Sequence, residues 1–452
     1  MTCSIIQKSQ LEGAHRLDAE YFQPKYLKID QEIRNSNYKT WEEIEGRFIT
    51  GPFGSEFNVD NYVLDGKFRY VRGKDVKEFF LLDDDNVYIP QKDFDRLQKC
   101  SLVKGDILIS VVGTLGNAVV VDNSVLPAIF SCKSTVFRSK SIDPYYLIAY
   151  LNSHYGRNLL IRNVRGAVQT GLNIGDLKFL PIIIPSINKQ KAIASIVVAA
   201  KKISDDSKFL YSQAEDLLLE ELGLKDFKPE EDLSCVVNLS DAKSVHRMDA
   251  EFFQPKYERI IQKINKHKVT LLGDLAIMKK GIEPGSDEYL NEGKLFIRVS
   301  SISMQGIIDR DQKYLSNELY QTFRTNFEPK VGEILLTKDA TPGIAYVIKE
   351  SVEGIISSGI MRLKLKEDIG TEYLALCINS IVGRMQMERD AGGSIIIHWK
   401  PEQIKNLQIP ILPKFTQQKI ADLVRKSHEA RKKAKELLDE AKQKVERIIS
   451  GE

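Results

Sequence analysis

The chain contains one unit written twice, and this duplication constrains its fold more than any other feature. The segment 15–26, HRLDAEYFQPKY, returns at 246–257 as HRMDAEFFQPKY, close to half-way along the 452 residues. A repeat this long is not a solenoid unit, whose period is about 20–50 residues. Each copy is long enough to bury its own core, so the sequence predicts two related domains.

Shorter matching segments follow in the same order and extend the repeat over the whole chain. GDIL at 105–108 returns as GEIL at 332–335, and LNS at 151–153 returns as INS at 378–380. Tyr70-Val71-Arg72 corresponds to Phe296-Ile297-Arg298. The stretches between these anchors diverge. A shared framework with different loops is expected of two domains that bind different targets, and drift after duplication is the alternative.

Composition limits the functional classes. With 42% hydrophobic and 28% charged residues, and no apolar run of about 18, the chain reads as a cytoplasmic globular protein without membrane attachment. Five cysteines without CxxC spacing argue against a disulfide framework or structural zinc. The net charge of +3 is low for a protein that binds nucleic acid alone. DNA binding would therefore need local basic patches or another subunit.

Each half predicts an α+β domain followed by a long helix. Short β-branched runs bounded by Gly, Asn and Pro predict strands in the domains 1–186 and 226–413. The segments 187–225 and 414–452 each contain a long stretch free of proline and glycine, which predicts a helix.

The apolar residues of both predicted helices step by three and four positions, the pattern of a coiled coil. We predict that the two helices pair antiparallel as a spacer, and the alternative is two helices packed on their own domains. Ser207 is the polar residue of the first seam. The seam residues are Ile193, Ile196, Ala200, Ile203, Leu210, Ala214 and Leu217 in the first helix, and Ile420, Leu423, Ser427, Ala430, Ala434, Leu437, Ala441 and Ile448 in the second.

The order of these motifs resembles the specificity subunits of type I DNA restriction–modification systems. The resemblance rests on HRxDAE[YF]F in each half, GPFGS at 51–55, QTGLNIGDLK at 169–178 and Gln190-Lys191 near the start of a long helix. The second copy departs from the pattern, because 169–173, QTGLN, becomes IIHWK at 396–400.

The resemblance implies a non-catalytic subunit without a cofactor of its own. Each half would be a target-recognition domain that reads one half of a split, asymmetric site in double-stranded DNA. The long helices would set the spacing and dock two methyltransferase subunits, which use S-adenosylmethionine, and a restriction or translocase motor subunit would add cleavage. Pairing with a fused nuclease–methyltransferase is a variant. A scaffold whose two domains bind proteins is the rival interpretation.

No motif indicates catalysis or a metal site. The chain lacks a glycine-rich phosphate loop and the acidic-Pro-Pro-aromatic motif of adenine methyltransferases, and no His pair has metal-binding spacing. An enzyme with an unrecognised site is the weakest alternative. We interpret the repeated His15 and His246 as structural or subunit-docking residues, with Asp18 and Asp249 capping a helix.

Base edges are read by Arg, Lys, Asn, Gln and hydroxyl side chains on loops. The loop 162–170 is the best candidate in the first domain, because it is rich in arginine and amide side chains. The candidate DNA-binding residues are Arg72, Lys74, Arg162, Arg165, Gln169 and Thr170 in the first domain, and Lys279, Lys280, Arg298, Arg389, Ser394, His398 and Lys400 in the second.

Overall fold

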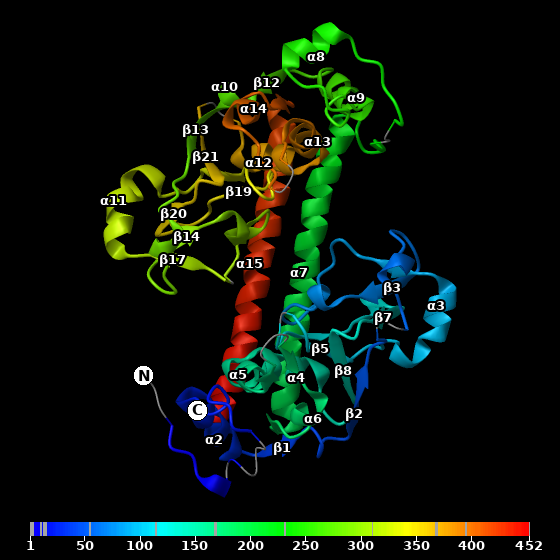
Figure 1. Ribbon diagram of the computed structural model, residues 1–452, viewed down its shortest axis with the longest axis vertical. Coiled ribbons are helices and arrows are strands. Elements are labelled where there is room, and N and C mark those ends of the chain that lie inside the picture. The colour runs from blue at the N-terminus through cyan, green and yellow to red at the C-terminus, as the bar shows by residue number, and fades with distance from the viewer. Residues whose placement is uncertain are drawn as a thin grey trace. The chain divides into compact units, whose positions relative to one another are not determined.

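The computed structural model describes residues 4–9, 11, 16–53, 56–113, 115–166, 170–229, 232–309, 311–366, 369–393 and 396–451. The chain forms two compact units (Figure 1). The first consists of Met1–Ser204 with Arg431–Glu452, and the second of Asp205–Ala430. Both long helices cross the boundary, so each unit contains one domain, the first part of its own helix and the last part of the other.

The first unit is built on a four-stranded antiparallel sheet of order β2-β8-β5-β6 and a three-stranded sheet of order β4-β3-β7. The strand β5 is buried on both faces, because Ile107 and Ile109 join the core that includes the helices while Leu108 joins the core with the smaller sheet. The strands are β2 (Gly46–Thr50), β3 (Phe68–Val71), β4 (Tyr88–Ile89), β5 (Ile107–Ser110), β6 (Ala118–Val120), β7 (Ala128–Phe130) and β8 (Ser134–Ser139).

The second unit repeats this topology, with sheets of order β13-β21-β18-β19 and β17-β14-β20. Ile334 and Leu336 face the helices and Leu335 faces the other way, as in β5. The strands are β13 (Ala276–Lys280), β14 (Lys294–Ile297), β17 (Lys313–Leu315), β18 (Ile334–Thr337), β19 (Ala345–Val347), β20 (Gly354–Ile356) and β21 (Ile360–Leu365).

Helices cover the large sheet of each unit, and short strand pairs close the domains. The pairs are β1 (Tyr38–Thr40) with β11 (Pro181–Ile183), β9 (Val164–Arg165) with β10 (Gly171–Leu172), β12 (Val269–Leu271) with β22 (Gln408–Pro410), and β15 (Ile302–Ser303) with β16 (Gly306–Ile307). The helices are α2 (Pro24–Arg34), α3 (Gln91–Arg96), α4 (Pro144–Asn152), α5 (His154–Arg162), α6 (Ile174–Leu177), α8 (Leu239–Val245), α9 (Pro255–Ile264), α10 (Leu272–Leu275), α11 (Asn317–Phe327), α12 (Thr371–Asn379), α13 (Ile381–Asp390) and α14 (Pro401–Lys405).

The predicted helix caps at Asp18 and Asp249 are wrong. The helices α2 and α9 begin at Pro24 and Pro255, several residues later, and proline suits this first position because it lacks an N–H. Both carboxylates instead accept hydrogen bonds from a nearby arginine, as described below.

The long helices α7 (Ile187–Glu221) and α15 (Lys414–Ser450) pack antiparallel, which confirms the predicted coiled coil and the α+β class. In the second unit the Ser207 and Ser427 hydroxyls each donate to the other residue's carbonyl at 2.8 Å. In the first unit Ala441 and Val445 join the core that contains Ile193.

The buried stripe differs from the predicted seam at every second position. It follows Ile193, Val197, Ala200, Ser207, Ala214 and Leu218 in α7, and Ile420, Val424, Ser427, Ala434, Ala441 and Val445 in α15. The predicted Ile196, Ile203, Leu210 and Leu217, and Leu423, Ala430, Leu437 and Ile448, are half-buried. The predicted and the observed stripes share positions such as Ile193 and Ala214. Three or four residues after each of these, both helices carry mainly apolar side chains, and the packing buries the one four residues on, as at Val197 and Leu218.

In the described part of the chain, no helix is both long and apolar enough to span a membrane.

Candidate nucleic-acid interface

Loops of the first unit meet at one end of its sheets. A Cβ at Gly51 would lie 2.4 Å from the Ser131 carbonyl carbon, and one at Gly73 would lie 2.8 Å from Lys133 Cβ. The Val111 amide donates to the Lys133 carbonyl at 2.9 Å. Val112 forms a backbone bridge with Gly171. These loops form the first loop cluster: Gly51–Phe53, Arg72–Lys74, Val111–Gly113, Ser131–Lys133 and Thr170–Leu172.

The second unit builds an equivalent group from the corresponding loops. Ile282 bridges Ser357, and a Cβ at Gly359 would lie 2.6 Å from Val299 Cγ2. The Lys338 amide donates to the Gly359 carbonyl at 2.9 Å. The second loop cluster comprises Gly281–Glu283, Arg298–Val299, Lys338–Ala340, Ser357–Gly359, Gly392–Gly393 and Ile396–Trp399, in which His398 bridges both Asp339 and Gly392.

Arg72 and Arg298 support the same loop in the two units. The Arg72 guanidinium donates to the carbonyl of Asp85, and Arg298 Nη2 donates to the carbonyl of Asp311 at 2.9 Å. Asp85 and Asp311 have left-handed φ values of 49° and 54°. Neither arginine is thus a freely extended side chain.

The charge of these two arginines is compensated differently. Arg72 pairs with Asp75, at 3.1 Å from Nη2 to Oδ1, and Lys74 Nζ lies 2.6 Å from Asp85 Oδ2. Hydrogen bonding and charge from Lys74, with the charge of Arg72, hold the pKa of Asp85 below its usual value. The residue equivalent to Asp75 is Ser301, which carries no charge, so Arg298 lacks the ion pair that Arg72 makes at this position.

Arg162 and Arg389 lie in the packing of the repeated HRxDAE[YF]F motif. Arg162 is 7% exposed, donates through Nε to the Tyr21 carbonyl at 3.0 Å and stacks its guanidinium 4.0 Å from the Tyr21 ring centre. Arg16 stacks on the same ring at 4.6 Å. Arg389 and Arg247 repeat this arrangement around Phe252, at 5.6 and 4.7 Å.

These contacts give the repeated motif a structural role. Arg16 binds Asp18 through two hydrogen bonds of 2.8 and 2.6 Å and also reaches the Val164 carbonyl at 3.0 Å. Arg247 binds Asp249 in the same way and reaches the Arg389 carbonyl at 3.1 Å. The motif therefore attaches the start of each domain to the segment that leads into its loop cluster.

The remaining candidates are mostly exposed. Arg165 ends strand β9, pairs with Gly171 of β10 and binds Asp176 through Nε and Nη2 at 2.6 and 2.7 Å. Lys279 Nζ donates to Asn326 Oδ1 at 2.7 Å. Thr170, Lys280 and Lys400 are exposed. Gln169, Ser394 and His15 lie outside the described residues.

Comparison with known families matches this chain twice. The model of the type I restriction modification DNA specificity domain matches residues 54–205 and 265–442, most of the chain. The chain belongs to this family. Each match contains most of one loop cluster and extends into one long helix, so the two specificity domains coincide with the duplicated sequence.

Solved structures of the same class are similar at low sequence identity. The type I restriction–modification S subunit from M. genitalium is 17% identical, with 91% of this chain and 96% of that chain covered and a TM-score of 0.44. The HsdS subunit from Thermoanaerobacter tengcongensis is 14% identical, with 92% and 96% covered and a TM-score of 0.29. Comparison with curated protein sequences finds no match.

The structure of these specificity domains adds candidates that sequence reasoning missed. Lys133 is exposed in the first loop cluster, and Lys338 and Asp339 lie in the second beside the predicted His398. The pair Lys338-Asp339 occupies the positions of Val111-Val112 in the first copy. A change from apolar to charged residues at matching positions of the two copies could have identified Lys338 and Asp339 as candidates from the sequence.

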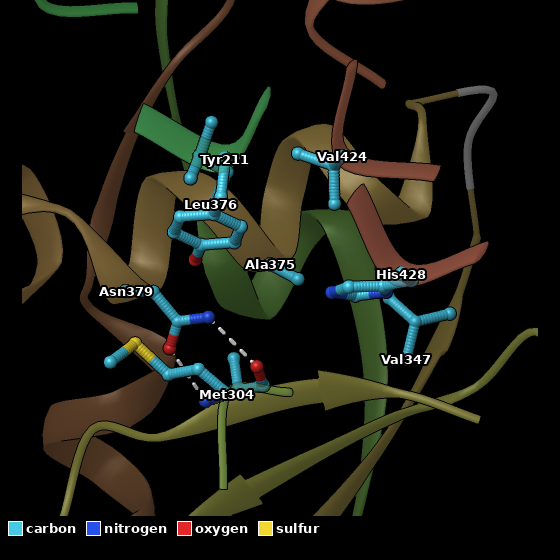
Figure 2. A pocket seen from close by; sticks show the side chains of 9 residues that line it. Tyr211, Met304, Val347, Ala375, Leu376, Asn379, Val424 and His428 are labelled. Carbon is cyan, nitrogen blue, oxygen red and sulfur yellow. Dashed lines mark hydrogen bonds between the residues drawn. The ribbon is translucent and has the colours of Figure 1, made fainter. Parts of the chain in front are cut away.

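The second specificity unit holds a small cavity, drawn in Figure 2. The cavity has room for about one water molecule. Asn379 is engaged with the Ala345 backbone through two hydrogen bonds of 2.8 Å, and burial raises the pKa of Tyr211 to about 12. The lining residues are Tyr211, Met304, Ala345, Val347, Ala375, Leu376, Asn379, Val424 and His428. This cavity is too small for a cofactor.

Among the described residues, no group of three or more His, Cys, Asp or Glu side chains is placed to hold a metal ion.

Proposed function

We propose that this chain is the non-catalytic specificity subunit of a type I restriction–modification complex, with each unit reading one half of a split DNA site. The observation that carries the proposal is the pair of loop clusters, which share backbone contacts and differ in side chains. Val112 and Gly171 bridge in the first cluster where Asp339 and His398 bridge in the second. Different side chains on one framework would read different bases, so the site would be asymmetric.

The two long helices would set the gap between the half-sites. Each unit's core includes residues from both helices, such as Val197 and Val445 in the first and Leu218 and Val424 in the second. A domain anchored to both helices cannot slide along one of them without losing buried apolar contacts. The length of the helix pair would therefore become part of the recognised sequence.

Repeated apolar residues support docking of two equal partner subunits. Ile5 and Val236, at equivalent positions of the two copies, are 98% and 103% exposed. Leu17 and Met248, inside the repeated motif, are 84% and 85% exposed. Large apolar side chains exposed at matching positions suit a protein partner that binds each copy in the same way.

We propose adenine methyltransferases as these partners, and a motor subunit as a further one. The methyltransferases would bring S-adenosylmethionine and catalysis. They would also supply positive charge to neutralise the DNA phosphates, because the net charge of this chain is only +3.

The test is the N6-methyladenine map of host DNA with and without this chain. The expected result is that methylation disappears at one split, asymmetric motif and persists at all others. Unchanged methylation in a host whose methyltransferase subunits are expressed would contradict the proposal.

A further inference from the structure

In the second loop cluster, the Asp339 carboxylate is hydrogen-bonded to two basic side chains, Lys338 and His398. Lys338 Nζ donates to Asp339 Oδ2 at 2.6 Å, and His398 Nδ1 lies 2.8 Å from Asp339 Oδ1. Burial alone would raise the pKa of Asp339, but hydrogen bonds from Lys338 and His398, together with the charge of Lys338, outweigh it and lower the pKa. Asp339 is therefore an ionised carboxylate near neutral pH, and it can only accept hydrogen bonds.

This fixes the tautomer of His398. Because Asp339 accepts, Nδ1 of the imidazole carries the proton, and Nε2 of the neutral ring is the hydrogen-bond acceptor. The His398 side chain is 57% exposed, and among the described residues Nε2 has no hydrogen-bond partner. An oriented acceptor is thus available at the surface of the cluster.

The loop that carries Asp339 is well ordered by its own contacts. Thr337 Oγ1 donates to the Thr341 carbonyl at 2.6 Å and accepts from the Ile344 amide at 3.0 Å. The Trp399 amide donates to the Lys338 carbonyl at 2.8 Å, and the Trp399 side chain is fully buried. His398 is therefore held on both sides, by Asp339 and by the neighbouring tryptophan.

The first unit shows that the polar group is not needed to build the fold. Its equivalent backbone bridge joins Val112 to Gly171, neither of which has a polar side chain. The first unit keeps the bridge, the loop and the sheet order without a carboxylate or an imidazole at these positions. Since the fold forms without these polar side chains, we explain Asp339 and His398 by what the second unit binds.

We infer that His398, oriented by Asp339, is a specificity-determining residue that accepts a hydrogen bond from a base amino group in the half-site of the second unit. The inference rests on the proposed function. The amino groups of adenine and cytosine are the donors of the major groove. A phosphate ligand fits less well, because phosphate oxygens accept hydrogen bonds and Nε2 of this tautomer has no proton to donate, while Lys338 is already engaged by Asp339 at 2.6 Å.

The experiment uses the complete complex of this chain with its methyltransferase subunits. DNA molecules with randomised bases at the split site are selected by binding and sequenced, for the wild type, His398→Ala and Asp339→Asn. His267→Ala, a half-buried histidine of the same unit beyond the end of α9, is the matched control.

The expected result is loss of preference at one or two adjacent positions of one half-site. The fall for His398→Ala is about 5- to 150-fold, the range for one specific base contact. Asp339→Asn reduces preference at the same positions, because it releases the imidazole orientation. The other half-site remains selected, which shows that the variants are folded, and His267→Ala behaves as the wild type.

Two results would overturn the inference on His398 without affecting the proposed function. In the first, His398→Ala keeps the wild-type base preference at every position; in the second, it loses base preference equally at both half-sites. A wild-type complex that selects no split site would overturn the proposed function, and the inference with it.

Discussion

At the scale of single residues, two arginines three positions apart have opposite environments. Arg162 is 7% exposed and lies against the Tyr21 ring, with Asp30 Oδ1 3.4 Å from its Nη1. The Arg165 side chain is 44% exposed and pairs with Asp176 at the surface. A pattern of arginines in a loop cannot separate these cases, because the Tyr21 ring that buries Arg162 comes from 141 positions earlier in the chain.

We predict that Arg162→Ala and Arg165→Ala separate stability from recognition. Arg162→Ala should lower the free energy of unfolding by about 2–3 kcal/mol, because it removes a buried guanidinium from the Tyr21 ring, leaves the Tyr21 carbonyl without this donor and takes one of the two arginines from Asp30. Arg165→Ala should change stability by less than about 1 kcal/mol and weaken one half-site by about 1–3 kcal/mol. Urea unfolding and DNA-binding titration measure the two effects. The reverse assignment of effects would contradict the prediction.

At the scale of elements, a buried pair of serines joins α7 to α15. Ser207 and Ser427 exchange hydrogen bonds at 2.8 Å in the second unit, while Ala200 and Ala434 occupy the equivalent positions in the first. A polar pair in an apolar seam favours one alignment, because any slip leaves the hydroxyls unsatisfied.

A double-mutant cycle tests this pair. Ser207→Ala and Ser427→Ala should each cost about 1 kcal/mol in the free energy of unfolding, since each removes one buried hydrogen bond between the helices. The double variant copies the alanines of the first unit and should cost less than the sum of the two. Strictly additive losses, measured by denaturant unfolding, would show that the serines act independently.

At the scale of the whole molecule, duplication repeats exposed apolar residues such as Leu17 and Met248, where we propose that two partner subunits dock. Leu17→Asp and Met248→Asp each place a charge in one exposed apolar site, so each should remove one methyltransferase from the complex, and the double variant both. Native mass spectrometry counts the bound subunits. Full occupancy of both sites in the double variant would place the docking surface elsewhere.

Helix length offers a second test at this scale. One added heptad in each long helix, after Ser204 and after Ala430, preserves the seam and lengthens the pair by about 10 Å at 1.5 Å per residue. The preferred gap should grow by about three base pairs, at 3.4 Å each. Four residues added to α7 alone should abolish assembly instead, because they break the seam. An unchanged gap in the heptad variant, read by methylation mapping, would exclude the helices as the spacer.

The sequence by itself determined the duplication, the two α+β domains and the two long helices. These features are local or periodic: strands follow β-branched runs, and α7 and α15 follow apolar steps of three and four. The resemblance to the type I specificity family rested on the order of the motifs together with the duplication, and the family match at 54–205 and 265–442 confirms it.

Only the tertiary structure decided which side chains are available at the candidate interface. It buried Arg162 against Tyr21, compensated Arg72 with Asp75, and brought His398 to Asp339, 59 positions earlier in the chain. It also selected Val197 and Leu218 over their neighbours in the helix seam. Such outcomes depend on contacts between distant segments, and the burial and charge balance of a side chain are properties of that packing rather than of its neighbours in sequence.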